Sequence, residues 1–276
     1  MFSHGVTGLR DSTSRISGRA VVHEWISATV RLPNPLKAIS GRLRHITSVL
    51  GYLVIAACSS PDLSSGDVEI VDLEFEDPVL KSCISALASR NDWRLSGQVS
   101  HLECTNSQAD KIRTLDGIEA LINLQSLNLA HNTISDPVLL DELRRLTILH
   151  LGHNDIQLVR FSRLHETLEA LNLDNNKIYD VTWLATFYRL EQLSMSQNQL
   201  RLIPAVVGLD SIKSLDLSHN DIVDVTPLKT LPIVESINLQ DNSLDCAAID
   251  DLKRSLPSGV DILTDCVSPE RKAQKD

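Results

Sequence analysis

The stretch Leu124-Gln-Ser-Leu127-Asn-Leu129-Ala-His-Asn132-Thr-Ile134 decides the fold, because its apolar frame recurs every 22 residues. Each copy has apolar residues eight, five and three positions before a fixed asparagine and two positions after it. A constant period in this range is typical of a solenoid, in which each repeat is one coil stacked on its neighbours. The six asparagines are Asn132, Asn154, Asn176, Asn198, Asn220 and Asn242.

The repeated asparagine has a physical role in such a coil. Side chains alternate along a strand, so the apolar residues at positions −5 and −3 from the asparagine face the interior. After the strand the chain turns inward and buries N–H and C=O groups that have no partner in a sheet. An asparagine amide both donates and accepts hydrogen bonds. A lone asparagine is usually a turn residue, whereas six in register predict a continuous asparagine ladder inside an apolar core.

The frame L-x-x-L-x-L-x-x-N-x-I resembles the leucine-rich repeat over residues 99–244. The segments Ile222-Val-Asp-Val225-Thr-Pro227-Leu228 and Ile178-Tyr-Asp-Val181-Thr-Trp183-Leu184 further resemble the convex part of the 22-residue repeats of bacterial internalins. The resemblance implies an α/β repeat fold, a curved leucine-rich repeat solenoid with parallel strands on its concave face. Its convex side would carry short irregular, 3-10 or helical segments.

Charge divides the chain into two parts. Residues 1–57 hold seven Lys and Arg and two Asp and Glu, whereas residues 58–276 hold 19 and 34, a net charge of −15. An acidic body repels phosphates, so we expect no nucleic-acid partner. Within the basic part, Lys37, Arg42 and Arg44 precede the apolar run 46–57, which is too short to span a bilayer. This order predicts a secretory signal peptide; the alternative is a buried N-terminal strand.

Ile55-Ala56-Ala57-Cys58 resembles the bacterial lipobox, in which the cysteine becomes the lipidated first residue of the mature protein. The resemblance implies export and a lipid anchor on Cys58, in the outer membrane if the host has one, as Ser59 hints. A signal peptide normally begins near residue 1, so residues 1 to about 29 are interpreted as an extension of a later true start. Residues 59–66 are expected to be a flexible tether.

Export implies an oxidising compartment, so the other four cysteines are expected to pair. Cys83 and Cys104 flank the first coil, and Cys246 and Cys266 flank the last. Only these two pairings avoid crossing the whole array. A cap helix is predicted to start at Asp77 and Pro78; Ile249, Leu252 and Leu256 predict a second cap helix, followed by a closing strand at 260–262. The arrangement resembles the cysteine-capped repeat domains of exported bacterial leucine-rich repeat proteins.

The outward strand positions define the candidate binding face, which is small, polar and nearly free of aromatic side chains. His131, His150 and His153 lie on adjacent coils and could bind a metal, but solvated histidines are the preferred interpretation and no metal or cofactor is predicted. The aromatic residues Phe161, Trp183 and Phe187 are expected to pack on the convex side. The binding face is predicted to comprise Asn128, His150, Asn172, Asp174, Ser194, Asp216 and Asn238.

The predicted function is recognition of another macromolecule, most simply a protein at the bacterial cell envelope, by a monomer without catalytic activity. The alternative is a structural or glycan-binding envelope protein. The chain lacks a Gly-rich phosphate loop and a metalloprotease helix motif. The predicted divisions are an extension with signal peptide (1–57), a tether (58–76), a helical cap with the first strand (77–104), the repeats (105–245), and a C-terminal cap and tail (246–276).

Overall fold

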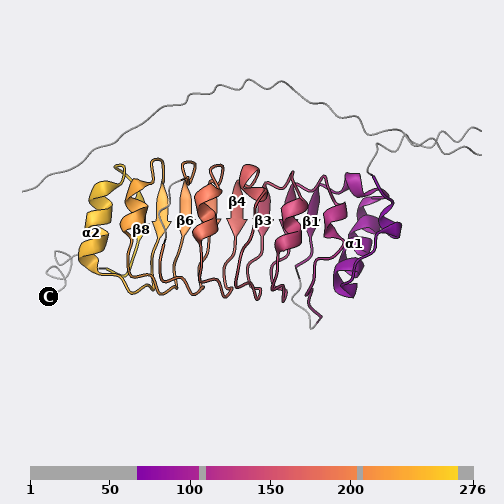
Figure 1. Ribbon diagram of the computed structural model, residues 1–276, viewed down its shortest axis with the longest axis horizontal. Helices are drawn as coiled ribbons and strands as arrows, with labels where there is room; N and C mark the ends of the chain where they lie inside the picture. The colour runs from indigo at the N-terminus through magenta and orange to yellow at the C-terminus, as the bar shows by residue number, and fades with distance from the viewer. Residues whose placement is uncertain (1–66, 106–109, 204–207, 267–276) are drawn as a thin grey trace, which may run out of the picture. The chain divides into compact units, whose positions relative to one another are not determined.

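The structure is a computed structural model that describes residues 67–105, 110–203 and 208–266. Within these ranges the chain forms a row of stacked coils with an α-helix at each end (Figure 1). The predicted signal peptide, Cys58 and residues 59–66 of the predicted tether lie outside the described residues. No helix among the described residues combines the length and the apolar character needed to cross a membrane.

Each coil contributes one short strand to a parallel sheet. The sheet has eight strands in chain order, and each strand pairs only with its neighbours in sequence. Equivalent residues of successive coils pair, so that Leu127 lies opposite Leu149 and Leu149 opposite Leu171. The strands are β1 (His101–Glu103), β2 (Ser126–Asn128), β3 (Ile148–His150), β4 (Ala170–Asn172), β5 (Gln192–Ser194), β6 (Ser214–Asp216), β7 (Ser236–Asn238) and β8 (Asp261–Leu263).

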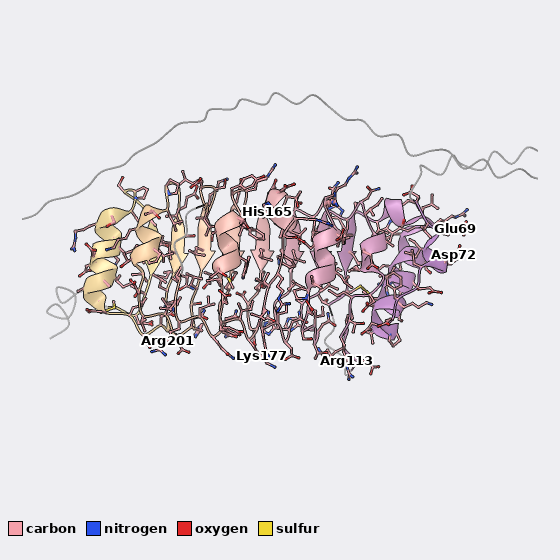
Figure 2. All side chains as sticks on the ribbon, in the orientation of Figure 1. Glu69, Asp72, Arg113, His165, Lys177 and Arg201 are labelled. Atoms are coloured by element: carbon pink, nitrogen blue, oxygen red, sulfur yellow. A yellow bond between two sulfur atoms is a disulfide. The ribbon has the colours of Figure 1, made fainter. Side chains whose placement is uncertain are left out.

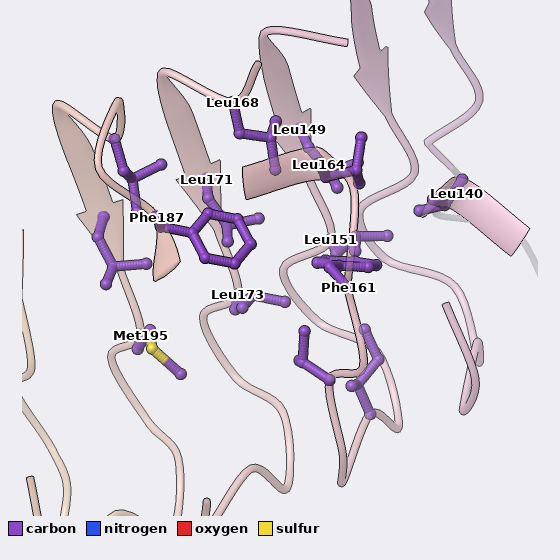
Figure 3. Packing of buried hydrophobic residues seen from close by; sticks show 14 of the residues in the cluster. Leu140, Leu149, Leu151, Phe161, Leu164, Leu168, Leu171, Leu173, Phe187 and Met195 are labelled. Atoms are coloured by element: carbon purple, nitrogen blue, oxygen red, sulfur yellow. The ribbon is translucent and has the colours of Figure 1, made fainter. Parts of the chain in front are cut away.

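The repeated apolar frame forms the core. Every frame residue is buried except the last, Leu244, which is partly buried against the others. Phe187 is fully buried and lies close to Leu171 and Leu173 of its own coil (Figure 3). Because a buried aliphatic side chain contributes about 1.5–3 kcal/mol, each coil is stable only when its neighbours cover both of its sides.

The asparagine ladder is present in all six coils, as predicted. In Asn176, Nδ2 donates to the carbonyl oxygens of Leu151 and Leu173, and Oδ1 accepts from the N–H of Ile156, each over 3.0 Å. Equivalent bonds recur at the other five asparagines. Each asparagine therefore completes its own turn and binds its coil to the preceding one.

The side opposite the sheet consists of short 3-10 segments, confirming the predicted convex side. Phe161 is buried there, and Trp183 is half-buried with its indole Nε1–H donating to the carbonyl of Asp180. Tyr179 and Tyr188 are exposed. The segments in the array are η3 (Ile118–Ala120), η4 (Val138–Glu142), η5 (Leu164–Glu166), η6 (Thr182–Thr186) and η7 (Thr226–Thr230).

The N-terminal cap is built on helix α1 (Pro78–Asn91), which begins where the sequence predicts. Oδ1 of Asp77 accepts from the N–H groups of Val79 and Leu80 at 2.9 and 3.1 Å, and so caps the helix. Oδ2 accepts from the N–H of Arg113 at 2.8 Å, which ties the helix start to the first full coil. Leu80 and Ile84 are fully buried.

The expected tether is wrong for residues 67–76, the part that the structure describes. This segment contains η1 (Ile70–Asp72), pairs with Leu95 through Glu69, and buries Ile70, Leu73 and Phe75. Apolar residues interrupt its acidic run at short intervals, so one side packs against the cap while the side chains of Glu69, Asp72, Glu74 and Glu76 stay exposed. A further 3-10 segment, η2 (Ser96–Gln98), follows the helix before β1.

The C-terminal cap consists of helix α2 (Cys246–Ser255) and strand β8, as predicted. Ile249 and Leu252 are fully buried, whereas Val260 and Ile262 are only partly buried. Each cap contains a disulfide, and the pairings are those predicted. Cys83 bonds Cys104 and Cys246 bonds Cys266, with Cα–Cα distances of 5.9 and 5.3 Å that are ordinary for a disulfide.

Candidate binding face

The outward side of the sheet, which we term the strand face, carries side chains at positions −6 and −4 from each ladder asparagine. The residues at −4 form a central row in which successive members are paired across neighbouring strands, about 4.8 Å apart. All are partly exposed. The structure therefore brings together the predicted residues Asn128, His150, Asn172, Ser194, Asp216 and Asn238, with Asp174 beside them.

Four side chains of the central row are fixed by their own backbone. The Oδ1 atoms of Asn128, Asn172, Asp216 and Asn238 accept from the N–H two residues later, over 2.9–3.2 Å. This local turn is the reason that Asn and Asp recur at −4. The central row is therefore partly architectural, which its residue types alone did not show.

Asp174 connects two coils on the strand face. Its Oδ1 accepts from Oγ of Ser194 at 2.6 Å and from the N–H of Ser196 at 2.8 Å. Its Oδ2 accepts from Nδ2 of Asn172 at 2.7 Å. The Asp174 carboxylate is thus held by the protein itself, and it fixes the positions of the polar groups around it.

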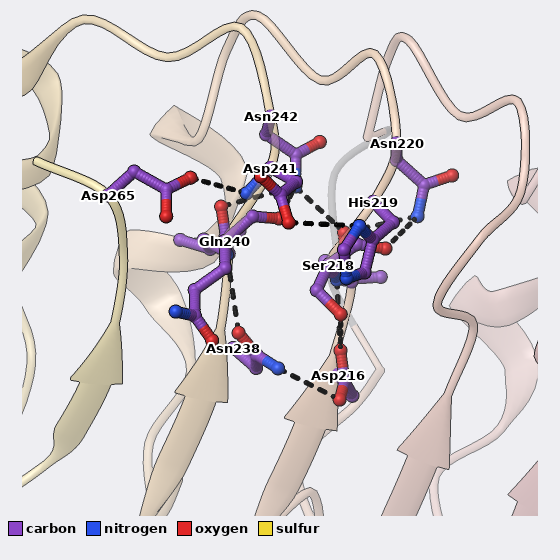
Figure 4. A network of polar contacts seen from close by, with 11 residues as sticks. Asp216, Ser218, His219, Asn220, Asn238, Gln240, Asp241, Asn242 and Asp265 are labelled. Carbon is purple, nitrogen blue, oxygen red and sulfur yellow. Dashed lines mark hydrogen bonds and ion pairs between the residues drawn. The ribbon is translucent and has the colours of Figure 1, made fainter.

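Asp216, two strands further along the central row than Asn172, has a similar role (Figure 4). Its Oδ1 accepts from the N–H and Oγ of Ser218 at 2.9 and 2.7 Å, and its Oδ2 accepts from Nδ2 of Asn238 at 3.0 Å. At the rim, Nδ1 of His219 lies 3.0 Å from Oδ2 of Asp241. Polar side chains in the central and C-terminal parts of the strand face are therefore ordered by one another.

A second column, directly before the ladder asparagines, has an unusual backbone. All six residues have φ between 49° and 62°, the left-handed region that residues other than Gly, Asn, Asp and His rarely occupy. Five of the six are Asn, Asp or His, but none is Gly, and the conformation was not predicted from the sequence. The column comprises His131, His153, Asn175, Gln197, His219 and Asp241.

The left-handed turn brings two of the three candidate metal-binding histidines together. The rings of His131 and His153 stack with centroids 4.1 Å apart and an interplanar angle of 15°. His150 instead belongs to the central row. Among the described residues, no group of three His, Cys, Asp or Glu side chains is arranged to hold a metal ion. The histidine pair is a stacking contact at the rim of the strand face.

Two buried carboxylates lie away from the strand face. Burial opposes ionisation of Asp77 and Asp141, but hydrogen bonds outweigh it and lower the pKa of both groups. Asp141 accepts from Oγ of Ser162 and from the N–H groups of Ser162, Arg163 and Leu164. Perturbed carboxylates often mark catalytic sites, yet these two are fully engaged in joining neighbouring segments.

Two hollows open on the strand face. The central hollow, of about 270 Å³, lies over β3–β6 and contains His150, Asn172, Ser194 and Asp216. The N-terminal hollow, of about 490 Å³, lies between α1 and the strands β1–β3. Its lining residues are Leu87, Asn91, Trp93, His101, Leu102, Glu103, Ser126, Asn128 and His150.

Trp93 is a functional candidate that the repeat pattern does not predict. Helix α1 ends at Asn91. The next residue, Asp92, adopts a left-handed conformation, and the N–H of Trp93 donates to the carbonyl of Ala88 at 2.9 Å. This reversal places the partly buried indole beside the first strands of the sheet. Trp93 precedes the repeats, so the 22-residue period gave no signal for its position.

Comparison with known proteins agrees with this geometry. Models of the leucine-rich repeat match residues 166–222 and 120–137. A sequence search of curated proteins gives no match. A leucine-rich repeat protein of Leptospira interrogans is similar at 25% identity and a TM-score of 0.52, covering 58% of this chain and 42% of that one. The chain thus spans less than half the length of the Leptospira protein.

Two internalins of Listeria monocytogenes share the fold. Internalin C2 is 24% identical with a TM-score of 0.50, over 72% of this chain and 98% of that one. Internalin F is 24% identical with a TM-score of 0.52, over 75% and 69%. Fold, asparagine ladder and repeat-model matches together define the fold class: the chain folds as a leucine-rich repeat solenoid. Its solenoid resembles those of internalins.

Proposed function

We propose that this protein is an exported bacterial lipoprotein that binds a protein partner on its strand face, without catalysis. The observation that carries the proposal is the ordered central row. Polar side chains lie side by side on successive strands and are fixed by hydrogen bonds such as those of Asp174 and Asp216. Side chains that are ordered before binding lose less conformational entropy on binding. An open, polar surface of this kind suits recognition of a macromolecule.

Export and anchoring are supported by the sequence around Cys58. A basic segment, a short apolar run and the sequence Ile55-Ala56-Ala57-Cys58 stand in the order of a lipoprotein signal. Two disulfides among the described residues fit an oxidising compartment. We propose no chemical reaction, because the cysteines and the buried carboxylates that the structure describes are all engaged in structural bonds.

The anchor is tested by changing Cys58. In bacteria fed an alkyne fatty acid, we expect the label and the membrane fraction to be lost in Cys58→Ser and retained in the matched control Ser59→Ala. Label that persists in Cys58→Ser would refute the anchor. The anchor would also be refuted if neither Cys58→Ser nor Ser59→Ala carried the label and both bound the membrane equally.

Binding on the strand face is tested by a pair of identical substitutions in one coil. Gln192 is exposed on β5 and lines the central hollow, whereas Gln199 is exposed beyond the ladder asparagine Asn198. We expect Gln192→Arg to abolish cross-linking of the full-length protein to its partner on intact cells, and Gln199→Arg to leave it unchanged. Loss with Gln199→Arg alone would place the partner on another surface.

A further inference from the structure

We infer that the N-terminal hollow binds an arginine side chain of the protein partner, with Trp93 and Glu103 as its two recognition elements. This inference rests on the proposed function and gives it a specific contact point. The hollow is the larger of the two on the strand face, and it combines an aromatic side chain with a carboxylate.

The strands fix the floor of the hollow. Glu103, Asn128 and His150 are paired in register across β1, β2 and β3, so they form one row over adjacent strands. His101 and Ser126 form the parallel row two residues earlier. The cap supplies the wall through Leu87, Asn91 and Trp93. The Cys83–Cys104 disulfide joins α1 of the wall to the residue after β1, the first strand of the floor.

Glu103 differs from Asp174 and Asp216, the carboxylates in the central part of the strand face. Asp174 and Asp216 are each bound by two or more side-chain or backbone donors. Within the described part of the chain, the exposed carboxylate of Glu103 has neither a cation nor a hydrogen-bond donor as partner. Its charge is therefore free to meet a ligand.

The hollow also lacks a positive charge of its own. None of the described lysines and arginines lines it. Figure 2 shows Arg113, Lys177 and Arg201 at the edge of the solenoid where the coils turn. Since the net charge of residues 58–276 is −15, a cationic group approaches this end of the sheet through a favourable field.

The chemistry of the lining fits a guanidinium group. A carboxylate accepts two parallel N–H donors from arginine, and an indole face attracts the same planar cation. Asn91 donates its Nδ2 to the carbonyl of Leu87 at 2.9 Å, so its Oδ1 can accept a further donor of the ligand. A neutral sugar could stack on Trp93, but it would cover Glu103 without compensating the charge, which is unfavourable.

The test is an NMR titration of the full-length protein with the peptide Ac-Gly-Arg-Gly-NH2. We expect the indole N–H resonance of Trp93 and the amide of Glu103 to shift in a saturable manner. The same peptide with citrulline, which is neutral and nearly isosteric, is expected to bind at least roughly tenfold more weakly, since a charged hydrogen-bonded pair is lost.

Variants separate the two recognition elements. Glu103→Gln is nearly isosteric at an exposed site and should weaken binding of the arginine peptide roughly tenfold or more. Trp93→Phe should weaken binding of the arginine peptide by a smaller factor, because it keeps an aromatic ring. It replaces Trp93→Leu if that variant disturbs the cap. The matched control is Asp261→Asn on β8, an exposed carboxylate at the far end of the sheet, which should leave the affinity unchanged.

Several outcomes would overturn the inference. Equal shifts with the arginine and citrulline peptides, or full binding by Glu103→Gln, would remove the charge-based recognition. Shifts of Trp93 with the neutral sugar chitobiose but not with the arginine peptide would assign the hollow to a glycan. If the wild-type protein does not bind the arginine peptide, while Gln192→Arg still abolishes cross-linking to the partner, the arginine site is refuted and the proposed function stands.

Discussion

Each end of the solenoid is closed by a cap with one disulfide, but the two caps differ in how well they are packed. At the N-terminal end, α1 buries Leu80 and Ile84 completely, and the segment before it adds Leu73 and Phe75 to the core. At the C-terminal end, α2 buries Ile249 and Leu252, but the closing strand β8 leaves Leu263 47% exposed. The cysteine separations are 21 and 20 residues, nearly equal.

The comparison shows that a cap can be closed by a disulfide without being well packed. Nearly equal loops confer nearly equal stabilisation in the chain-entropy model, so any difference in stability between the ends comes from buried apolar surface. In a solenoid each coil contacts only its neighbours, and stability is approximately a sum of local contributions. We therefore expect unfolding to begin at the C-terminal end.

The largest expected effect comes from removing core volume at each cap. Ile84→Ala should lower the free energy of unfolding by about 2–5 kcal/mol, because a fully buried side chain is replaced by a cavity. Ile262→Ala, at a partly buried position, should cost about 1 kcal/mol. Urea unfolding followed by circular dichroism measures both. Equal losses would contradict the contrast in packing.

Removing each disulfide tests the comparison of the two caps directly, because the two disulfide loops are nearly equal in length. Replacing Cys83 and Cys104 together by alanine, or Cys246 and Cys266 together, should cost about 3 kcal/mol in either case. Hydrogen exchange by mass spectrometry should then show opening confined to the affected cap. Spread of the opening across the whole array from the C-terminal pair would show that the ends are coupled.

The N-caps of the two helices give a smaller contrast. Asp77 is buried and accepts from four backbone N–H groups, whereas Asp245 is exposed and caps α2 through Ala247 alone. Asp77→Ala should cost about 2 kcal/mol and Asp245→Ala about 0.5–1 kcal/mol, the two ends of the range for N-caps. Thermal unfolding of both variants measures the two losses in stability. A larger loss for Asp245→Ala than for Asp77→Ala would contradict this prediction.

The Asp77 cap also has a pH signature. The folded-state pKa is lowered by hydrogen bonds that outweigh burial, so its stabilisation is complete above the ordinary carboxyl pKa of about 3.9. The stabilisation is lost as the pH falls through the lowered value. The stability difference between wild type and Asp77→Asn should therefore be constant near neutral pH and shrink below about pH 4. Urea titrations from pH 7 to 2.5 test this, and a difference that grows on acidification would refute it.

The smallest effect is a gain in the middle of the array, which gives a reference for both ends. Gln197 has φ of 56°, a left-handed conformation that is unfavourable for a residue with a Cβ atom. Gln197→Gly should raise stability by about 1 kcal/mol, whereas Gln197→Val should lower it. A melting temperature that falls for Gln197→Gly would show that its side chain has a stabilising contact.

The sequence predicted the features that recur with the 22-residue period. The strands, the asparagine ladder and the central row all follow from alternation around a fixed position, so Leu127 or Asn128 could be placed without a structure. The disulfides followed from the order of Cys83 to Cys266 along the array. Features that depend on contacts outside the period were missed or misread.

Three examples show the physical reason. Residues 67–76 pack because Ile70, Leu73 and Phe75 meet a helix surface that sequence spacing did not reveal. Trp93 reaches the strand face through a left-handed reversal at Asp92. Aspartate is one of the residue types that adopt this conformation, but the 22-residue period gave no reason to expect it there. The left-handed conformation at Gln197 recurs at the same place in the turn of all six coils although the residue type there varies.

The ladder also determines how such a chain can change its length during evolution. Each asparagine bonds only its own coil and the coil before it, with the same partners at every step. Duplication or loss of one whole 22-residue unit leaves every remaining bond of the array with an equivalent partner. Gain or loss of a single residue disrupts two coils at once. Natural variants of this solenoid should therefore differ in reach by whole coils, while the fixed caps at both ends are retained.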